Sequence, residues 1–514
     1  MAVRQGAKMV VSAKIKRRDF LQKTAAMLSL GALPVSLPSM TRARVDIAAI
    51  LDQGLNSSRA MDYASSLADG IGARLTGSSN MARAYDWALV QMQLLGLDNI
   101  CLEPVPIEVM GWQHVETRVR MATPATMDFM AQAGPWSRGT KGLLQAGAVA
   151  VVLSNDEDLE RFRGQLGGKI VLLGPMRDVP ANTRPLTERY TDEEVLSGSI
   201  NAPVRAYYRN RAQRQPIRAE QEAFARRLQA FLEAEGVAGV LLPSRDGAHG
   251  GGSGTLSIDD SPFAPQGWRE ETRPAFPFAY VAIEHFGRAW RLLSAGQPVQ
   301  LVMAIEVEET PSLQPVWNVV GDFLGTDPSA SIVVAGAHLD SWSSGTGALD
   351  NASGVANVLE AVRILKAVGF KPRRTVRVVL FGAEEQGLWG AREYVRKHLE
   401  QTPHAIMFNM DGGAGRARAV FSGGDSAVAA RFVGVKGALT DLGVLSVYDE
   451  PFWPADQSVF SEAGVPGIMF LQDPLDYFTR ARHSNMDTME RMPPQDMAQL
   501  SSVLAVFIAS EADR

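Results

Sequence analysis

The second half of the chain alternates between short apolar runs and amphipathic stretches. Apolar runs of strand length occupy residues 332–335, 376–381, 406–409 and 467–471. Between them, apolar side chains recur at helical spacing in residues 352–368 and 388–399. Strands that alternate with helices pair in parallel, because each helix returns the chain to the start of the next strand. The pattern therefore predicts an α/β fold with a mostly parallel sheet covered by helices on both faces.

The stretch from residue 46 to 96 is predicted to be mainly helical. Gly96 ends its last helix, and the positions that recur there at helical spacing are Ala84, Trp87, Ala88, Val90, Gln91 and Leu94. From about residue 121 the texture changes to short β-type runs, such as 149–153, 169–173 and 237–242, separated by Gly, Pro and Asn. We therefore predict a domain formed by residues 45–120 and 312–514, with residues 121–311 inserted into it as a β-rich domain.

Residues 1–44 are predicted to be an export signal rather than part of the fold. Arg17-Arg18 precede Phe20-Leu21 and an apolar stretch from about residue 24 to 37. This order is typical of a twin-arginine signal. The apolar stretch is short and contains Pro34 and Pro38, so it predicts no lasting membrane anchor. We expect a bacterial protein that is periplasmic or extracellular.

Charge and cysteine content narrow the class of protein further. Residues 1–44 hold nine Lys or Arg against Asp19, a net charge of +8, which leaves −13 on the rest of the chain. An acidic body repels phosphate backbones, so nucleic acid is not an expected partner. Cys101 is the only cysteine, which excludes an intrachain disulfide and a multi-thiolate metal site. We expect Cys101 to be a small core residue of a strand.

Metal-ligand residue types form one ordered series in the second half of the chain: His338, Asp340, Asp350, Glu384, Glu385, Asp411 and His483. Several of them directly follow predicted strands, at the sheet edge where open α/β folds bind ligands. Two imidazoles and several carboxylates are what a pair of divalent zinc-like ions needs. In the adjacent pair of glutamates, one carboxylate can hold metal while its neighbour moves a proton. The series therefore predicts hydrolysis by a metal-activated water.

Each of these residues also has a simpler interpretation when taken alone. Asp350 could be an ordinary helix N-cap, and His483 a surface histidine. The other histidines of this half, His398 and His404, are interpreted as structural, and His249 as a solvated loop histidine.

The motifs around the series resemble those of the dinuclear zinc exopeptidases, a family that includes bacterial aminopeptidases and carboxypeptidase Q. Within it they are most like those of carboxypeptidase Q. The matching motifs are Gly336-Ala-His338-Leu-Asp340-Ser-Trp342, Gly347-Ala-Leu-Asp350-Asn351, Ala383-Glu384-Glu385-Gln386-Gly387, Ala463-Gly-Val-Pro-Gly467, His483-Ser484 with Asp487-Thr488-Met489, and Gly72 with Arg74-Leu-Thr-Gly-Ser78. The resemblance covers nearly all of the chain after the signal. It implies a zinc exopeptidase fold in which the inserted region is a protease-associated domain.

The resemblance also implies a role for each residue of the series. Asp350 should bridge two Zn²⁺ ions, for which Co²⁺ or Mn²⁺ could substitute. His338 and Asp411 should complete the ligands of one ion, and Glu385 and His483 those of the other. Glu384 should be the general acid/base, and Asp340 should hydrogen-bond His338 and orient its ring.

The expected substrates are dipeptides or short peptides. Asp456 stands where the family has an acidic residue near the pocket, so it is a candidate contact for a substrate amine, or else a helix cap. Arg480 or Arg482 could pair with a substrate carboxylate, or be a solvated loop arginine. The resemblance further implies a homodimer.

Two other functions fit the same sequence less well. A glutaminyl-cyclase-like enzyme would share the fold but hold one zinc ion, and the metal content per chain would distinguish it. A binding protein without catalysis would have lost ligand positions, whereas here every position of the motif is filled.

Overall fold

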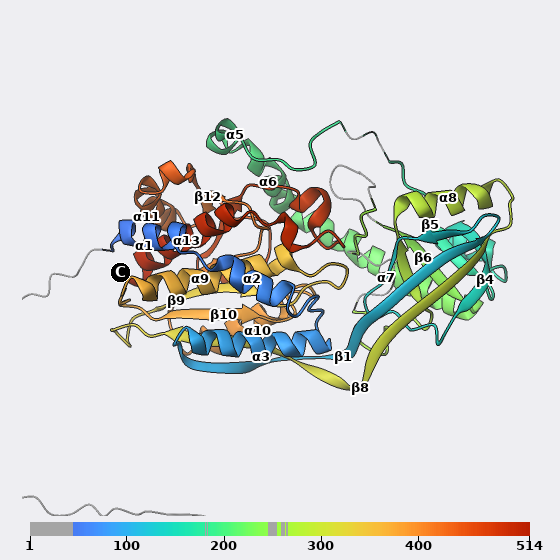
Figure 1. The fold of residues 1–514 in the computed structure, drawn as a ribbon, viewed down its shortest axis with the longest axis horizontal. Helices are drawn as coiled ribbons and strands as arrows, with labels where there is room; N and C mark the ends of the chain where they lie inside the picture. Colours follow the sequence, from blue (N-terminus) through green and yellow to red (C-terminus); the bar gives the residue numbers. More distant parts are fainter. Residues whose placement is uncertain (1–44, 180, 182, 245–253, 259–262, 264–265) are drawn as a thin grey trace, which may run out of the picture. The chain divides into compact units, whose positions relative to one another are not determined.

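The computed structural model describes residues 45–514 except 180, 182, 245–253, 259–262 and 264–265. The predicted export signal and His249 lie outside these described residues. Val45–Arg514 form one compact unit, whose elements are labelled in Figure 1. None of the helices in the described part of the chain combines the length and the apolar character that a membrane span requires.

The strands join into one extended sheet with the order β13-β12-β14-β11-β9-β10-β8-β4-β5-β6-β7-β3, and β1 pairs with β8 and β2. The strand bounds are β1 Asp98–Thr123, β2 Met127–Phe129, β3 Ala131–Ala133, β4 Leu144–Val152, β5 Ile170–Gly174, β6 Gly239–Pro243, β7 Phe278–Val281, β8 Gln300–Phe323, β9 Ile332–His338, β10 Val376–Phe381, β11 His404–Asn409, β12 Ala417–Phe421, β13 Ser446–Tyr448 and β14 Gly467–Gln472. The α-helices are α1 Ile47–Asn56, α2 Ala60–Ala68, α3 Ser79–Leu94, α4 Asp156–Phe162, α5 Asp192–Ser197, α6 Ala202–Arg209, α7 Arg211–Glu235, α8 Ile283–Ser294, α9 Ser353–Ala367, α10 Trp389–His398, α11 Ser426–Gly437, α12 Asp456–Glu462 and α13 Pro494–Ala512.

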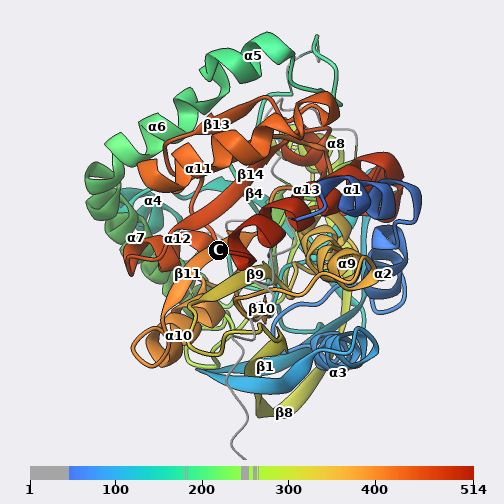
Figure 2. The ribbon, with the colours of Figure 1, turned by 90° about the vertical axis from the view of Figure 1, so that its left-hand side faces the viewer.

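Strands β10, β9, β11 and β14 are parallel, and antiparallel strands β8 and β12 flank them. Side chains on this sheet alternate between two apolar layers. Val333 and Ala335 pack into the layer that includes α9 and α13, whereas Val334 and Val379 pack into the layer of α10 and α12. Figure 2 shows these helices on either side of the strands. The predicted mixed α/β fold, with helices on both faces of a large sheet, is confirmed.

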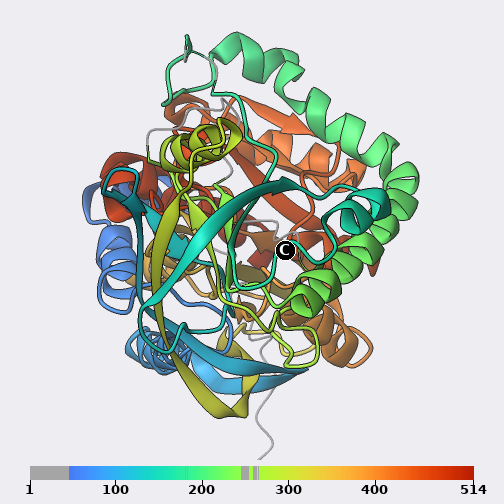
Figure 3. The ribbon, with the colours of Figure 1, turned by 90° about the vertical axis from the view of Figure 1, so that its right-hand side faces the viewer.

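Strands β4, β5, β6 and β7 form a second parallel stretch of the sheet. Ile170 and Leu172 face an apolar cluster with Phe286 of α8, and Val171 faces a different cluster with Leu228 of α7. Figure 3 views the molecule from this end. Helix α7 ends at Gly236, which takes the left-handed conformation with φ of +67° that caps a helix.

Two long antiparallel strands connect the two stretches. Strands β1 and β8 pair along most of their length, and β8 also pairs with β10 at one end and with β4 at the other. Pro104 and Pro106, together with several irregularities in register, interrupt the alternation of side chains along β1, so the sequence did not predict one long strand there. Both predicted limits of the inserted domain, at residues 121 and 311, fall inside these strands, and the domain limits stay a prediction.

In two places, the burial of side chains in the N-terminal region differs from what the sequence pattern predicted. In α3 the buried face is formed by Met81, Ala84, Tyr85, Ala88 and Met92, whereas Leu94 is 77% exposed. Cys101 does lie in a strand, but the prediction that it is a core residue is wrong, because Cys101 is exposed. It lies near the start of β1, among the charged side chains of Glu103, Lys397 and Arg377.

Candidate metal centre

The fold gathers the predicted series at the carboxyl edge of the parallel strands. His338 is the last residue of β9, Glu384 and Glu385 follow β10, and Asp411 follows β11. Asp350 lies in the short turn Ala348–Ala352 ahead of α9, and His483 lies between β14 and α13. Residues separated by up to 145 positions along the sequence therefore meet at one place.

Asp350 lies between the two histidines. Its Oδ1 is 3.1 Å from Nε2 of His338, and its Oδ2 is 3.3 Å from Nε2 of His483. Asp411 Oδ1 is 3.6 Å from the same nitrogen of His338, and Glu385 Oε2 is 3.2 Å from Nε2 of His483. Asp350 is not the N-cap of α9, a position held by Ala352, so the simpler interpretation of this residue is wrong.

These side chains form overlapping groups whose ligand atoms lie within 4.8 Å of one another. One group is His338, Asp350 and Asp411, another is Asp350, Glu385 and His483, and Asp350 belongs to both. Oε1 of Glu385 is buried and has no hydrogen-bond partner in the part of the chain that the structure describes, an arrangement that a cation would satisfy. The donor set, imidazole nitrogens with carboxylate oxygens, fits zinc.

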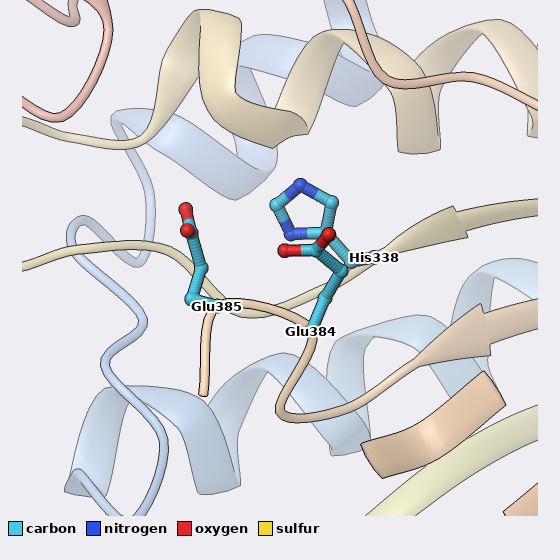
Figure 4. A group of neighbouring side chains, drawn as sticks. All are labelled: His338, Glu384 and Glu385. Carbon is cyan, nitrogen blue, oxygen red and sulfur yellow. The ribbon is translucent and has the colours of Figure 1, made fainter. Parts of the chain in front are cut away.

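Glu384 belongs to a third group, with His338 and Glu385. Figure 4 shows the carboxylate of Glu384 beside the imidazole ring of His338, with Glu385 pointing to the same side of the loop. Burial, together with the charges of Asp411 and Glu385, raises the pKa of Glu384 well above its ordinary value, although His338 opposes the shift. Burial would likewise raise the pKa of Asp350, but hydrogen bonds from His338 and His483 hold it well below its ordinary range. The two carboxyls thus differ in the way that a proton-transfer group and a ligand differ.

Asp340 does not orient His338 in the predicted way. The ring nitrogen Nδ1 of His338 lies 3.0 Å from the backbone oxygen of Asp340, and 3.8 Å from its carboxylate. The carboxylate instead accepts hydrogen bonds from the backbone N–H groups of Glu384 and Glu385, at 3.1 and 3.2 Å. Asp340 lies two residues beyond the end of β9, where its carboxylate is closer to the loop after β10 than to the ring of His338. Asp340 therefore fixes the loop that carries the glutamate pair.

Two further residues, Tyr477 and Asp487, form hydrogen bonds with the Asp350 turn, although no role was predicted for them. Tyr477 donates from its hydroxyl to Oδ2 of Asp350 at 2.8 Å. The carboxylate of Asp487 accepts the backbone N–H groups of Leu349 and Asp350, at 2.5 and 3.2 Å. Burial and the nearby Asp350 raise the pKa of Asp487 to about 8. Only the motif around Asp487 signalled its importance, and no signal in the sequence marked Tyr477.

Arg74 ties the N-terminal loop to the centre. Its guanidinium is buried and donates to the backbone oxygens of Leu339, Thr346 and Gly347 at 2.8–2.9 Å. Arginine suits this position because its fixed fork of donors reaches several carbonyl groups at once. The loop at Gly72 and Arg74–Ser78, singled out in the sequence, is thus a structural brace for the turns on either side of Asp350.

A segment from the predicted insertion holds the loop of His483. The backbone N–H of Ile258 donates to the backbone oxygen of His483 at 3.1 Å. The side-chain amide of Asn485 accepts from the N–H of Leu256 at 2.7 Å and donates to the backbone oxygen of Gly254 at 3.2 Å. His483 itself has a φ of +55°, a left-handed conformation that costs energy in any residue with a side chain. These hydrogen bonds hold the histidine in that conformation.

We expect Asn485→Ala to weaken metal retention roughly 10- to 100-fold, as loss of groups that support metal ligands commonly does. The substitution removes the two side-chain bonds to residues 254 and 256 but leaves the candidate ligands in place. Metal content after dialysis measures the effect, circular dichroism checks the fold, and Asn56→Ala, at an exposed helix end, is the matched control. Equal metal retention in both variants would contradict a role for Asn485.

The remaining candidates lie around the centre or apart from it. Asp456 is fully buried and does not cap α12, and neither of its carboxylate oxygens has a hydrogen-bond partner among the described residues. Nε of Arg482 is 4.0 Å from Oδ2 of Asp350, whereas Arg480 pairs with Asp476 at 2.8 Å. Away from the centre, His398 lies 2.8 Å from Glu103, and His404 lies 3.0 Å from the hydroxyl of Tyr394. Both histidines have structural contacts, as predicted.

Comparison with known proteins agrees with the geometry. Residues 318–508 match the family described as peptidase family M28. The chain is 26% identical to carboxypeptidase Q of Rattus norvegicus and 27% identical to that of Homo sapiens, over 90% of this chain and 86% of each relative. The sequence resemblance to zinc exopeptidases is therefore confirmed, and the chain is a relative of metallo-exopeptidases.

Solved structures show the same fold. A peptidase M28 precursor from Shewanella amazonensis SB2B aligns with a TM-score of 0.65 at 25% identity, covering 91% of this chain and 96% of that one. A zinc aminopeptidase from Bacillus subtilis aligns with a TM-score of 0.53 at 20% identity, covering 88% of this chain and 94% of that one. Both alignments extend well beyond residues 318–508, into the region with strands β3 to β7.

Proposed function

Starting from the match of residues 318–508 to peptidase family M28, we propose that this chain is an exported exopeptidase that uses two zinc ions to hydrolyse dipeptides or short peptides. The observation that carries the proposal is the position of Asp350, with one carboxylate oxygen facing His338 and the other facing His483. A carboxylate placed in this way suits a bridge between two cations.

The proposed ligands divide into two sets that share Asp350. His338 and Asp411 would hold one ion, and Glu385 and His483 the other, with Co²⁺ or Mn²⁺ as possible replacements for Zn²⁺. When bound, the ions would lower the pKa of water and polarise the carbonyl group of the scissile peptide bond. Tyr477, Asp487 and Arg74 keep the Asp350 turn in the required position through the hydrogen bonds described above.

Glu384 is the proposed proton carrier. It accepts a proton from the attacking water and delivers it to the nitrogen of the leaving amine. The raised pKa of Glu384 supports this assignment, because it makes this carboxyl a stronger base than an ordinary glutamate. Asp340 keeps the Glu384 loop at the reaction centre by accepting its backbone N–H.

We assign recognition of the amino end of the substrate to Asp456 and recognition of its carboxyl end to Arg482. The buried carboxylate of Asp456 lacks a partner among the described residues, and an amino group of the substrate would supply one. The side chain of Arg482 is 43% exposed, so an ion pair between it and a substrate carboxylate would be partly screened by water. Recognition of the amino end should therefore contribute more to binding than recognition of the carboxyl end.

A screen of free, N-acetylated and C-amidated dipeptides tests this proposal. We expect N-acetylation to lower kcat/KM at least about tenfold, because it leaves the buried Asp456 without its charged partner. Amidation should lower it by a smaller factor. Hydrolysis of each form is followed by release of the free amino acid, with metal analysis of the same sample. A larger loss on amidation would reverse the assignment of ends, and no hydrolysis of any form would refute the proposed function.

We also propose that the protein is exported, that it contains the inserted domain and that it forms a homodimer. The twin-arginine pattern of residues 1–44 supports a periplasmic or extracellular location in a bacterium. The resemblance to carboxypeptidase Q over 90% of this chain supports a protease-associated domain at residues 121–311. We propose short peptides as the partners, with no nucleic acid and no lasting membrane anchor.

A further inference from the structure

A cleft of about 690 Å³ lies between α7 and the helices α10 and α12. Figure 2 shows α7 beside α12. We call it the arginine cleft, because its lining includes Arg211, Arg214 and Arg218 of α7 and Arg392 of α10. Its volume lies within the range of about 300–1,000 Å³ that is usual for small-ligand sites.

The charge of this cleft is opposite to that of the protein around it. Four arginines line it against a single carboxylate, Glu462. The chain as a whole carries −5, and −13 once residues 1–44 are set aside. A local positive charge on an acidic protein is a selective attraction for anions. The fork of donors on each guanidinium matches the two oxygens of a carboxylate.

Contacts within the cleft position three of the four arginines. Arg211 pairs with Glu462 at 2.7 Å, and the guanidinium of Arg214 lies over the ring of Tyr207, 5.0 Å from its centre. Nε of Arg392 donates to the backbone oxygen of Gly387 at 3.1 Å. The side chain of Arg218 is 81% exposed, and it pairs with Glu222, also on α7. A charged ligand would therefore find donors already in position on facing walls.

Some residues that line the cleft are close neighbours, along the chain, of residues in the candidate metal centre. Gly387 and Leu388 line the cleft, and their backbone N–H groups both donate to the backbone oxygen of Glu384 at 2.8 Å. On α12, Gln457 lines the cleft and directly follows Asp456. A peptide bound at the centre by one end could thus extend its further residues into the arginine cleft.

We propose that the arginine cleft binds acidic side chains of short peptide substrates, an inference that rests on the peptidase function proposed above. Aspartate or glutamate residues away from the cleaved bond would contact Arg214 and Arg218, while the bond itself lies near Glu384. The enzyme would therefore prefer acidic peptides over neutral peptides of the same size.

The test compares tetrapeptides that differ only in charge. The substrates are Asp-Asp-Ala-Ala and Ala-Ala-Asp-Asp, each with its Asn counterpart, so that either direction of binding is covered. For at least one pair, we expect kcat/KM of the Asp peptide to exceed that of the Asn peptide about tenfold or more at low salt. The ratio should fall in 0.5 M NaCl, because salt screens exposed charges. Equal rates within both pairs would overturn the proposal.

Variants locate the effect in the cleft. In Arg214→Gln/Arg218→Gln the preference for Asp should fall to within about twofold, with hydrolysis of Ala-Ala unchanged. Arg226→Gln, on the same helix but outside the cleft, should keep the preference. A preference that survives the double substitution would place it elsewhere and overturn the proposal. If no peptide is cleaved, the proposed function fails. Calorimetric binding of the same tetrapeptides to the double variant and to the natural protein then still decides whether the cleft binds acidic peptides.

Discussion

Replacing Glu384 with Gln should lower kcat for dipeptide hydrolysis by about 10²- to 10⁴-fold while the protein keeps its fold and its metal. That range is the usual contribution of a general acid or base. Gln has nearly the same shape as Glu but cannot take up and return a proton. The carboxylates that face the two histidines, Asp350, Asp411 and Glu385, are untouched by the change.

Steady-state kinetics and elemental analysis of the same sample check this expectation. Glu400→Gln is a suitable control, because Glu400 is exposed just beyond α10 and belongs to none of the groups that could hold a metal ion. Near-normal turnover in Glu384→Gln would show that another group moves the proton. A loss of activity accompanied by a loss of metal would instead place Glu384 among the ligands, in the group it forms with His338 and Glu385.

Removing metal with a chelator should reduce hydrolysis to background and lower the melting temperature. Asp350, Glu384, Glu385 and Asp411 gather around two imidazoles, and without cations their negative charges repel one another at short range. A ligand that binds only the folded state raises its stability, so its removal lowers that stability. Both effects should reverse on addition of Zn²⁺, and at least partly with Co²⁺ or Mn²⁺.

Counting the metal separates this proposal from its alternatives. Two ions per chain in the active protein, and none after chelation, are the expected values. One ion per chain with no peptide hydrolysis would favour the cyclase-like reading. Full turnover by metal-free protein would end the metal-based mechanism altogether.

The meeting of these candidate ligands could be predicted because several of them directly follow regular strands. Strands such as β9 and β10 are continuous apolar runs, and parallel strands end at a common edge, so His338 and Glu384 could be placed near each other without coordinates. Their roles as ligand and base remain predictions. The convergence of His483, which lies far along the chain, could be inferred only from the resemblance to known motifs.

Other features depend on contacts between distant parts of the chain, which no local pattern encodes. Such contacts include the hydrogen bond from Tyr477 to Asp350 and the hydrogen bonds from Arg74 to the turns beside Asp350. They also include the hydrogen bonds between residues 254–258 and the His483 loop. Cys101 lies beside charged side chains of β8, β10 and α10, and no local pattern in the sequence indicates that these strands and this helix meet there. The length of strand β1 was not predicted, because its prolines break the alternation on which strand prediction relies.

The shared strands β1 and β8 restrict how this protein can be divided for study. Recombinant fragments cut at residues 120 and 311 would remove the end of β1, divide β8 near its middle and leave unpaired hydrogen-bonding edges on each piece. Such pieces would aggregate more readily than either portion does when joined. Crystallisation trials and activity assays should therefore start from the uncut polypeptide, with only the predicted export signal at residues 1–44 removed.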